Sequence, residues 1–265
     1  MQIRVGFFIF GSKSPAMHTN ICLNCEAPVS DKFCSRCGQK TDTHRITAKH
    51  FIFHDLVHGV WHVDRGILVT TKEVFTRPGY AARDYIAGKR IKYYNIFYLM
   101  LLLLGVMLIV GNYVDGGLIG KRPANEPEEV KILNDILSKY TKLLYLALIP
   151  VFAFNGWLLF RKLKFNFTEH LIMGGFVSVG LCLFVLSGMF LDIFNNTYAD
   201  LLSNSFGIIC LLYPCYAYYQ FAKYKYTIPG FGWRIVLLYA LLYLEKEIFI
   251  GDIMLFLLKQ LLNTD

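Results

Sequence analysis

Four cysteines near the start of the chain have the clearest chemistry. Cys22, Cys25, Cys34 and Cys37 form two Cys-x-x-Cys pairs separated by eight residues. Each pair places two thiolates on one tight turn, and two facing turns complete a tetrahedron around Zn²⁺. Gly38 follows the second pair and allows the sharp turn that such a knuckle needs. Four protein ligands leave no open position on the metal, so we predict a structural zinc site; the alternatives are two disulfides or four unrelated thiols.

Four histidines follow at a spacing of four residues, and they are His50, His54, His58 and His62. On a helix each step of four turns a side chain by only about 40°, so neighbouring imidazoles lie on one face. An adjacent pair could bind a transition metal or relay protons, which makes the series a candidate second metal or proton site. The alternative is that imidazoles simply suit the polar face of an amphipathic helix at the membrane surface.

A run of cations stands directly before the first long apolar segment. It consists of Arg77, Arg83, Lys89, Arg90 and Lys92. Such a run can contact the phosphates of anionic lipid headgroups, or it can serve only to orient the following helix in the membrane.

The elements that must position these residues are apolar helices. The chain has 265 residues, of which 55% are hydrophobic, and this is too apolar for an ordinary soluble domain. Five segments are long and apolar enough to span a bilayer. They are 94–111, 143–160, 171–194, 201–221 and 233–258. We therefore expect an all-α polytopic membrane protein with a small N-terminal zinc-ribbon head and an interfacial amphipathic helix.

The distribution of Lys and Arg predicts how the chain is oriented. These residues cluster before the first apolar segment, in 161–164 and in 223–225, and are absent from 195–200. Since cytoplasmic loops carry the excess of Lys and Arg, we expect the N-terminus in the cytoplasm and 112–142 outside. A reducing cytoplasm also keeps the thiols available to zinc.

The predicted metal site, the juxtamembrane helix and the apolar segments divide the chain into four parts. Residues 1–21 form an extension that a mis-assigned start would explain, 22–40 the zinc ribbon, 41–93 a cytoplasmic juxtamembrane helical segment and 94–265 the membrane bundle. The formal net charge of +8 could indicate nucleic acid, but the basic residues stand beside apolar segments. We therefore expect anionic lipid as the partner and no nucleic acid.

Four further polar residues fall within or beside the apolar segments. Glu169 and His170 stand at the start of the third segment, where Glu169 would also suit helix capping. Glu245 and Glu247 interrupt the fifth, which is either one polar-containing helix facing the bundle or two pieces that break near Gly251.

Several of these motifs together resemble an uncharacterised bacterial membrane family, domain of unknown function 3667. The resemblance rests on Cys-Ser-Arg-Cys-Gly-Gln-Lys at 34–40, Thr-His-Arg-Ile-Thr at 43–47, the histidine series, Arg-Pro-Gly at 77–79 and Tyr-Ile-Ala-Gly-Lys-Arg at 85–90. It covers most of the chain from Cys22 onward. Glu-His-Leu at 169–171 also resembles a family element, although Gly175 and Val179 stand where later histidines would be expected. The resemblance implies an integral membrane protein with a zinc-ribbon head and no known activity.

Three functions remain open from the sequence. The first is a non-enzymatic scaffold in the bacterial inner membrane, whose cytoplasmic zinc head recruits a protein partner. The second is a small transporter or lipid-handling protein that uses the polar residues of the bundle. The third is a membrane enzyme with a histidine-based metal or acid–base centre. The scaffold is favoured because no hydrolase, metalloprotease, P-loop or dinucleotide motif is present.

Overall fold

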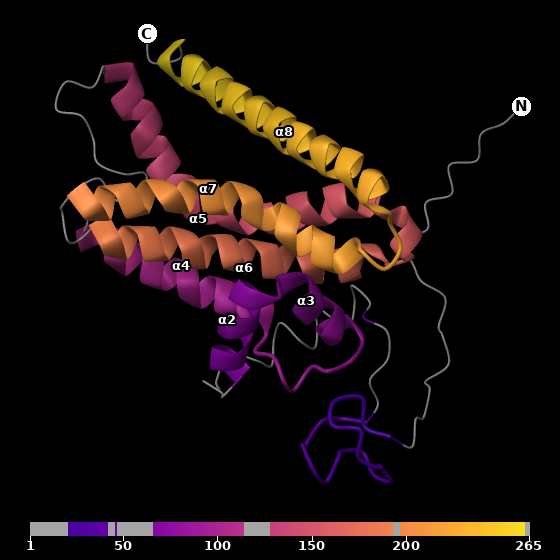
Figure 1. Ribbon diagram of the computed structural model, residues 1–265. Coiled ribbons are helices and arrows are strands. Elements are labelled where there is room, and N and C mark those ends of the chain that lie inside the picture. Colours follow the sequence, from indigo (N-terminus) through magenta and orange to yellow (C-terminus); the bar gives the residue numbers. More distant parts are fainter. Residues whose placement is uncertain (1–20, 42–45, 47–65, 114–127, 193–196, 263–265) are drawn as a thin grey trace, which may run out of the picture.

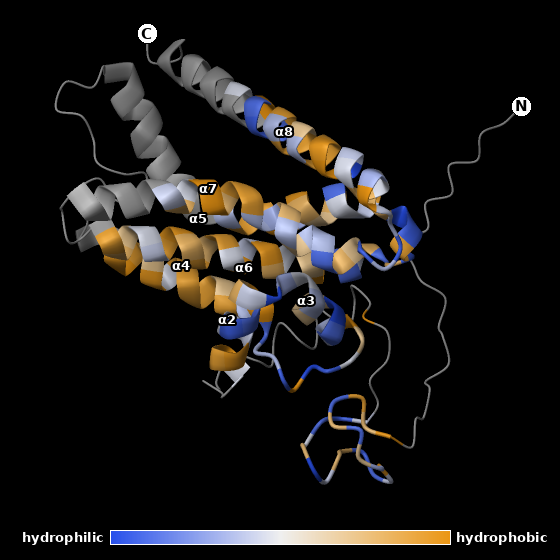
Figure 2. Cartoon of the chain, in the orientation of Figure 1, coloured by the Kyte–Doolittle hydropathy of each residue, from blue (hydrophilic) through white to orange (hydrophobic). Residues whose placement is uncertain are grey.

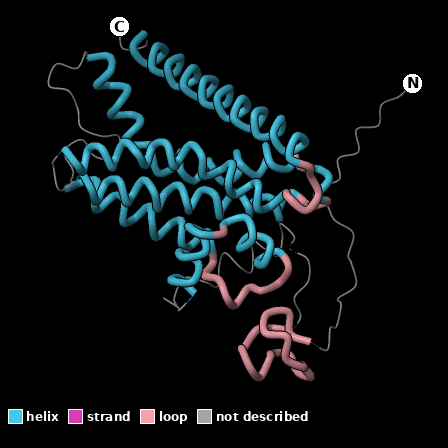
Figure 3. Tube along the Cα trace, viewed as in Figure 1, coloured by secondary structure: helices cyan, strands magenta, loops and turns pink. Residues whose placement is uncertain are grey.

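The computed structural model of the chain describes residues 21–41, 46, 66–113, 128–192 and 197–262, and most of these residues from Gly66 onward are helical (Figure 1). The short helices come first and the long apolar ones follow. In chain order they are α2 (Gly66–Thr76), α3 (Pro78–Ile86), α4 (Ile96–Tyr113), α5 (Glu128–Leu159), the 3-10 helix η3 (Arg161–Leu163), α6 (Phe167–Asp192), α7 (Thr197–Ala222) and α8 (Ile228–Leu262). The described residues form no strand (Figure 3), and extended pairing among them is limited to two isolated bridges near the start.

Helix α6 forms the centre of the bundle. It packs against α4, α5 and α7 along its length, and against α2 and α3 near one end. Its sequence explains the position, because between Glu169 and Asp192 it has no charged residue and its glycines allow close approach by neighbours. Accordingly, 72% of the most apolar stretch of this helix is buried inside the protein. Figure 2 shows the apolar residues of α4 and α6 running side by side.

Helices α2 and α3 pack across the end of this bundle. Pro78 begins α3 as its first residue, where a missing N–H does no harm, and it separates α3 from α2. Gly79 lies so close to α7 that a Cβ there would stand 2.3 Å from the carbonyl oxygen of Ala217. Its N–H donates to Oε1 of Gln220 at 3.1 Å. A glycine is therefore required for α3 to reach α7.

Helix α8 stands apart from the rest of the bundle (Figure 1). It makes few contacts with α5 and α7, and only 17% of its most apolar stretch is buried inside the protein. It runs unbroken from Ile228 to Leu262, so the alternative of a break near Gly251 is wrong. Two polar contacts join it to α5: Nε of Arg234 donates to the carbonyl of Leu159 at 3.0 Å, and Nδ2 of Asn155 donates to Glu245 at 2.8 Å.

Each of the five predicted apolar segments corresponds to one of the helices α4 to α8. The second segment, 143–160, corresponds to the apolar part of α5, Leu144–Leu159, and the helix itself begins earlier, at Glu128, within the connection 112–142. Within the described residues, Phe167–Leu191 and Ile228–Ile248 are long and apolar enough to cross a membrane. The apolar stretches Ile96–Gly111 and Leu144–Leu159 are shorter.

Candidate metal centre and its docking loop

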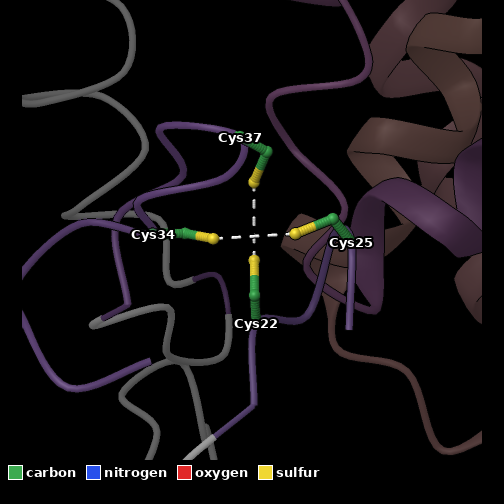
Figure 4. Close-up of side chains that lie close together, drawn as sticks. All are labelled: Cys22, Cys25, Cys34 and Cys37. Atoms are coloured by element: carbon green, nitrogen blue, oxygen red, sulfur yellow. Dashed lines mark hydrogen bonds between the residues drawn. The ribbon is translucent and has the colours of Figure 1, made fainter. Parts of the chain in front are cut away.

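The four N-terminal cysteines converge on one point (Figure 4). Their sulfur atoms all lie within 4.8 Å of one another. The Sγ atoms of Cys22 and Cys37 are 3.6 Å apart, and so are those of Cys25 and Cys34. Within the described residues the four cysteines are free thiols. They can therefore hold one metal ion between them.

Two similar turns bring the sulfurs together. In the first, the N–H of Glu26 donates to the carbonyl of Cys22 at 2.9 Å; in the second, that of Gly38 donates to Cys34 at 2.8 Å. Both residues at the bend have left-handed backbone angles, with φ of 60° at Glu26 and 75° at Gly38. The glycine was expected for this reason, whereas the first turn places a glutamate in the same strained conformation.

The second turn also favours the thiolate that a metal requires. The pKa of Cys34 is lowered to about 7, chiefly by a hydrogen bond from the backbone N–H of Cys37. The pKa of the neighbouring Cys25 is raised to about 12, because a backbone hydrogen bond from Ala27 is outweighed by desolvation and the other three cysteines, so Cys34 is the first of this pair to ionise. A thiol that ionises near neutral pH is a ready metal ligand.

Gln39 joins this cysteine head to the rest of the protein. Its side chain is buried, and its Nε2 donates to the carbonyl of Gly88 at 2.8 Å. Its Oε1 accepts a longer bond, 3.4 Å, from the N–H of Ile91. Leu23 adds an apolar contact, since its side chain fills the space beside Gly88. The head therefore rests on residues 88–91 of the loop that links α3 to α4, and we call these four residues the docking loop.

A network of charges fixes the base of the docking loop. Glu73 on α2 accepts hydrogen bonds from Lys92 at 2.6 Å, Tyr93 at 2.5 Å and Arg77 at 2.9 Å. Asp84 on α3 accepts from Lys89 at 3.1 Å and from Arg77 at 3.1 Å, and the hydroxyl of Tyr93, whose single proton points to Glu73, lies 3.2 Å from it. Burial alone would raise the pKa of both carboxyls, but these donors outweigh it and lower the pKa of each below its usual value.

The cationic run predicted from the sequence therefore has partners inside the protein. Arg77, Lys89 and Lys92 form ion pairs with the two acids of the network. Arg83 donates to the carbonyl of Phe221 at 2.9 Å, and its guanidinium lies over the ring of Tyr224 at 4.8 Å. Arg90 is half-buried in the docking loop. Contact of this run with lipid phosphates stays a prediction.

Glu169 and His170 have different surroundings. Glu169 is buried and forms a reciprocal cap with Asn166: its N–H donates to Asn166 Oδ1 at 2.8 Å, and its Oε2 accepts from the N–H of Asn166 at 2.7 Å. This is a capping box, so the capping interpretation of Glu169 is confirmed. His170 is buried between the rings of Phe165 and Phe221, and its Nδ1 has no hydrogen-bond partner in the described structure.

The two glutamates of the last helix also separate. Glu245 is half-buried against Asn155 of α5, whereas Glu247 is exposed and lies 3.8 Å from Lys246. Only Glu245 faces the bundle. The four histidines at 50, 54, 58 and 62 lie outside the described residues, so their predicted metal or proton site stays a prediction.

The fold and this site define a class of protein: a helical chain with two helices long enough to cross a membrane and a candidate metal centre on a separate head. Residues 64–107, which comprise α2, α3, the docking loop and most of α4, match the model of a family described as "Protein of unknown function (DUF3667)". The resemblance drawn from the sequence is confirmed for this segment. No curated protein and no solved structure matches the chain.

Sequence reasoning missed several residues of the site. Gln39 was noticed only as part of a motif, and Glu73, Asp84 and Tyr93 were not assigned any role as partners of the cations. A signal for the network was present, because Glu73 and Arg77 are four residues apart and both stand within the segment that the family model matches.

Proposed function

We propose that this chain is a multi-pass protein of the bacterial inner membrane that acts as a non-enzymatic scaffold. Its head, residues 22–40, binds one structural Zn²⁺ and presents a fixed surface to a protein partner at the cytoplasmic end of the helices. The lack of an open metal position and the absence of a catalytic motif both favour this role over an enzyme.

The spacing of the sulfurs supports zinc. A tetrahedral Zn²⁺ with Zn–S bonds of about 2.3 Å has sulfurs about 3.8 Å apart, close to the 3.6 Å between each facing pair. Cys22, Cys25, Cys34 and Cys37 would hold the ion. When bound, it supplies folding energy to a head that has very little apolar core of its own.

The exposed apolar surface supports a membrane. Large apolar side chains are exposed along α4, α5, α7 and α8, whereas polar side chains such as Asn155, His170 and Ser178 are buried. A water-soluble bundle would reverse this arrangement. Helix α8 carries most weight, because a largely exposed apolar helix is not explained as the core of a soluble protein. Among its exposed side chains are Trp233, Val236, Tyr243 and Ile248.

The arrangement of the loops supports a cytoplasmic head. The basic turns 161–164 and 223–225 meet at one end of the bundle, where the N–H of Lys162 donates to the hydroxyl of Tyr226 at 3.0 Å. Arg83 of α3 donates a hydrogen bond to the carbonyl of Phe221 at the end of α7. Because the docking loop follows α3 directly, it lies at the same end of the bundle. The Lys and Arg asymmetry then assigns that end to the cytoplasm.

The observation that carries the scaffold role is the pair of hydrogen bonds between the side chain of Gln39 and the docking loop. They hold the head in one position on the bundle, as recruitment to a defined place requires. The outer surface of the head meanwhile exposes apolar side chains, with Phe33 59% and Ile21 55% exposed. Exposed aromatic and aliphatic groups beside charged residues are typical of protein-binding surfaces.

The test replaces Phe33 by a photo-crosslinking amino acid in full-length protein in intact cells. We expect a cross-link to one defined protein, and we expect it to be lost in a Cys34→Ser background. The same probe at Lys72, exposed on α2 and away from the head, is the matched control and should give no such product.

Metal analysis of the purified protein accompanies the cross-linking. It should give one zinc per chain, and Cys34→Ser should remove it while the helices stay folded. A protein that contains zinc and gives no cross-link at position 33 contradicts the scaffold role. A protein without zinc contradicts the metal site itself.

A further inference from the structure

A second group of cations lies at the same end of the bundle, and the ion-pair network does not include it. It consists of Arg161, Lys162, Lys223, Lys225 and Arg234, from η3, the turn between α7 and α8, and the start of α8. We call it the turn cluster. Among the residues that the structure describes, no carboxylate forms an ion pair with any of the five. In the cationic run before α4, by contrast, Arg77, Lys89 and Lys92 are neutralised by Glu73 and Asp84.

Aromatic rings hold four of these cations in place. Arg161 lies over Trp157 with 5.4 Å between the guanidinium carbon and the ring centre. Lys162 and Arg234 both lie over Tyr226, at 5.8 and 4.4 Å. Each ring orients its cation without removing the charge.

The remaining contacts link the cluster into one surface. Lys223 lies over the rings of Tyr80 and Tyr224, at 5.0 and 5.5 Å. Arg234 also lies over Trp233 at 4.0 Å, and its N–H groups donate to the carbonyls of Leu159 and Gly230. Its Nε and Nη1 groups are thus engaged within the protein, and it contributes a fixed positive charge.

The cluster stands where the apolar helices end. The apolar part of α5 ends at Leu159, and the candidate spans of α6 and α8 begin at Phe167 and Ile228. Tryptophan and tyrosine side chains beside Lys and Arg at this level match the composition of a membrane–water interface. The exposed side chains Arg161, Lys162, Lys223 and Lys225 therefore stand at the depth of lipid headgroups.

We propose that the turn cluster is a binding site for the phosphate of an anionic lipid headgroup. A guanidinium that stacks on a ring keeps its N–H edges free, so Arg161 can donate to phosphate oxygens while Trp157 holds its face. Lys162, next to Arg161 on η3, and Lys223, on the turn between α7 and α8, add point charges, and Arg234 provides a fixed positive background. The proposal shares with the scaffold role only the placement of the helices in a membrane, and it depends on nothing in the zinc head.

The tryptophans of the chain provide a local probe. There are three, and two of them, Trp157 and Trp233, belong to this surface. In a Trp61→Phe variant the fluorescence reports on the turn cluster alone. Full-length protein in neutral detergent is titrated with phosphatidylglycerol brominated near the headgroup, or with phosphatidylcholine brominated at the same position. Bromine quenches tryptophan at short range, so the two titrations compare an anionic with a neutral headgroup at one place.

We expect the anionic lipid to quench at a concentration at least about tenfold lower than the neutral one, since each cation near an anionic headgroup favours binding severalfold. The triple variant Arg161→Gln, Lys162→Gln, Lys223→Gln should bring this ratio close to one. The matched control Lys32→Gln, Arg36→Gln, Lys72→Gln removes the same charge from exposed positions elsewhere and should keep the ratio.

The remaining outcomes contradict the proposal in distinct ways. Equal quenching by both lipids in the Trp61→Phe protein would show that no headgroup site exists, although the helices contact lipid. Relief of anionic-lipid quenching by excess inorganic phosphate would assign the site to a free phosphate ion. Quenching by neither lipid would contradict the membrane placement itself, and with it the proposed function.

Discussion

The contact between the head and the docking loop can be broken by one isosteric substitution, Gln39→Glu. A glutamate keeps the size of the side chain and an oxygen that accepts from the N–H of Ile91. It loses the Nε2–H group that donates to the carbonyl of Gly88 at 2.8 Å, and at neutral pH it places a carboxylate oxygen against that carbonyl. The backbone of residue 39, which accepts a bond from the N–H of Cys34, is unchanged.

The expected loss of docking free energy follows from the two hydrogen bonds of the Gln39 side chain. The bond to Ile91 is long at 3.4 Å, contributes little, and is retained. The bond to Gly88 is short, and breaking it leaves a buried carbonyl without a partner. A lost bond that strands a buried acceptor costs about 2 kcal/mol, which corresponds to about a thirtyfold fall in the equilibrium constant for docking.

Hydrogen exchange followed by mass spectrometry measures this change. Peptides that contain Ile91 should exchange up to about thirtyfold faster in Gln39→Glu, because undocking exposes that N–H. Peptides from α6 should exchange at the parent rate. Arg36→Ala, an exposed change on the same head, is the control and should leave Ile91 unaffected. Unaltered exchange at Ile91 in a folded variant, or equal acceleration by Arg36→Ala, would refute the role assigned to Gln39.

Two further predictions concern the helices below the docking loop. Gly79→Ala should destabilise the protein by about 1–3 kcal/mol in a thermal unfolding assay in detergent, because its Cβ would overlap the backbone of α7; Gly105→Ala on α4, where no neighbouring atom lies within 4 Å, should be neutral or stabilising. Glu73→Gln should destabilise by about 2 kcal/mol near neutral pH, since it weakens charge-assisted bonds from Arg77, Lys92 and Tyr93. Because the pKa values of Glu73 and Asp84 are lowered in the folded protein, this stabilisation is present above their ordinary values of 4.5 and 3.8 and is lost as the pH falls below them. The difference in stability between the parent and Glu73→Gln should therefore disappear in acid. A difference that persists there would show that the charge of Glu73 is not its cause.

The sequence predicted those features that depend on short spacing or on composition. The Cys-x-x-Cys pairs determine the sulfur cluster locally, because each pair shares one turn. Long apolar runs identified α4 to α8, since a helix that buries or exposes apolar groups on all sides needs little else to be recognised.

Features that depend on contacts between distant segments were not predictable in this way. Gln39 and Gly88 are 49 residues apart, and only the folded chain brings them together. The cationic run was interpreted as a lipid contact because a sequence shows charges but not their partners. Glu73 and Asp84 neutralise part of it only after α2 and α3 fold across the bundle. Arg161, Lys162, Lys223 and Lys225 of the turn cluster contributed only to the predicted orientation, and Arg234 to no prediction, since nothing in the sequence shows that η3 and the α7–α8 turn meet.

The position of Gln39 also predicts a link between docking and metal affinity. Its backbone carbonyl accepts the N–H of Cys34 inside the metal turn, while its side chain holds the docking loop. A head that loses zinc loses that turn, so the metal-free form cannot place the side chain against Gly88. Docking and zinc binding then stabilise each other by the same free energy.

If docking contributes about 2 kcal/mol, Gln39→Glu should weaken zinc binding by up to about thirtyfold, while the purified variant still retains one zinc per chain. Competition with a chelator of known affinity measures this shift in full-length protein. Equal zinc affinity in parent and variant, together with faster exchange at Ile91, would show that the head folds around its metal independently of the helices.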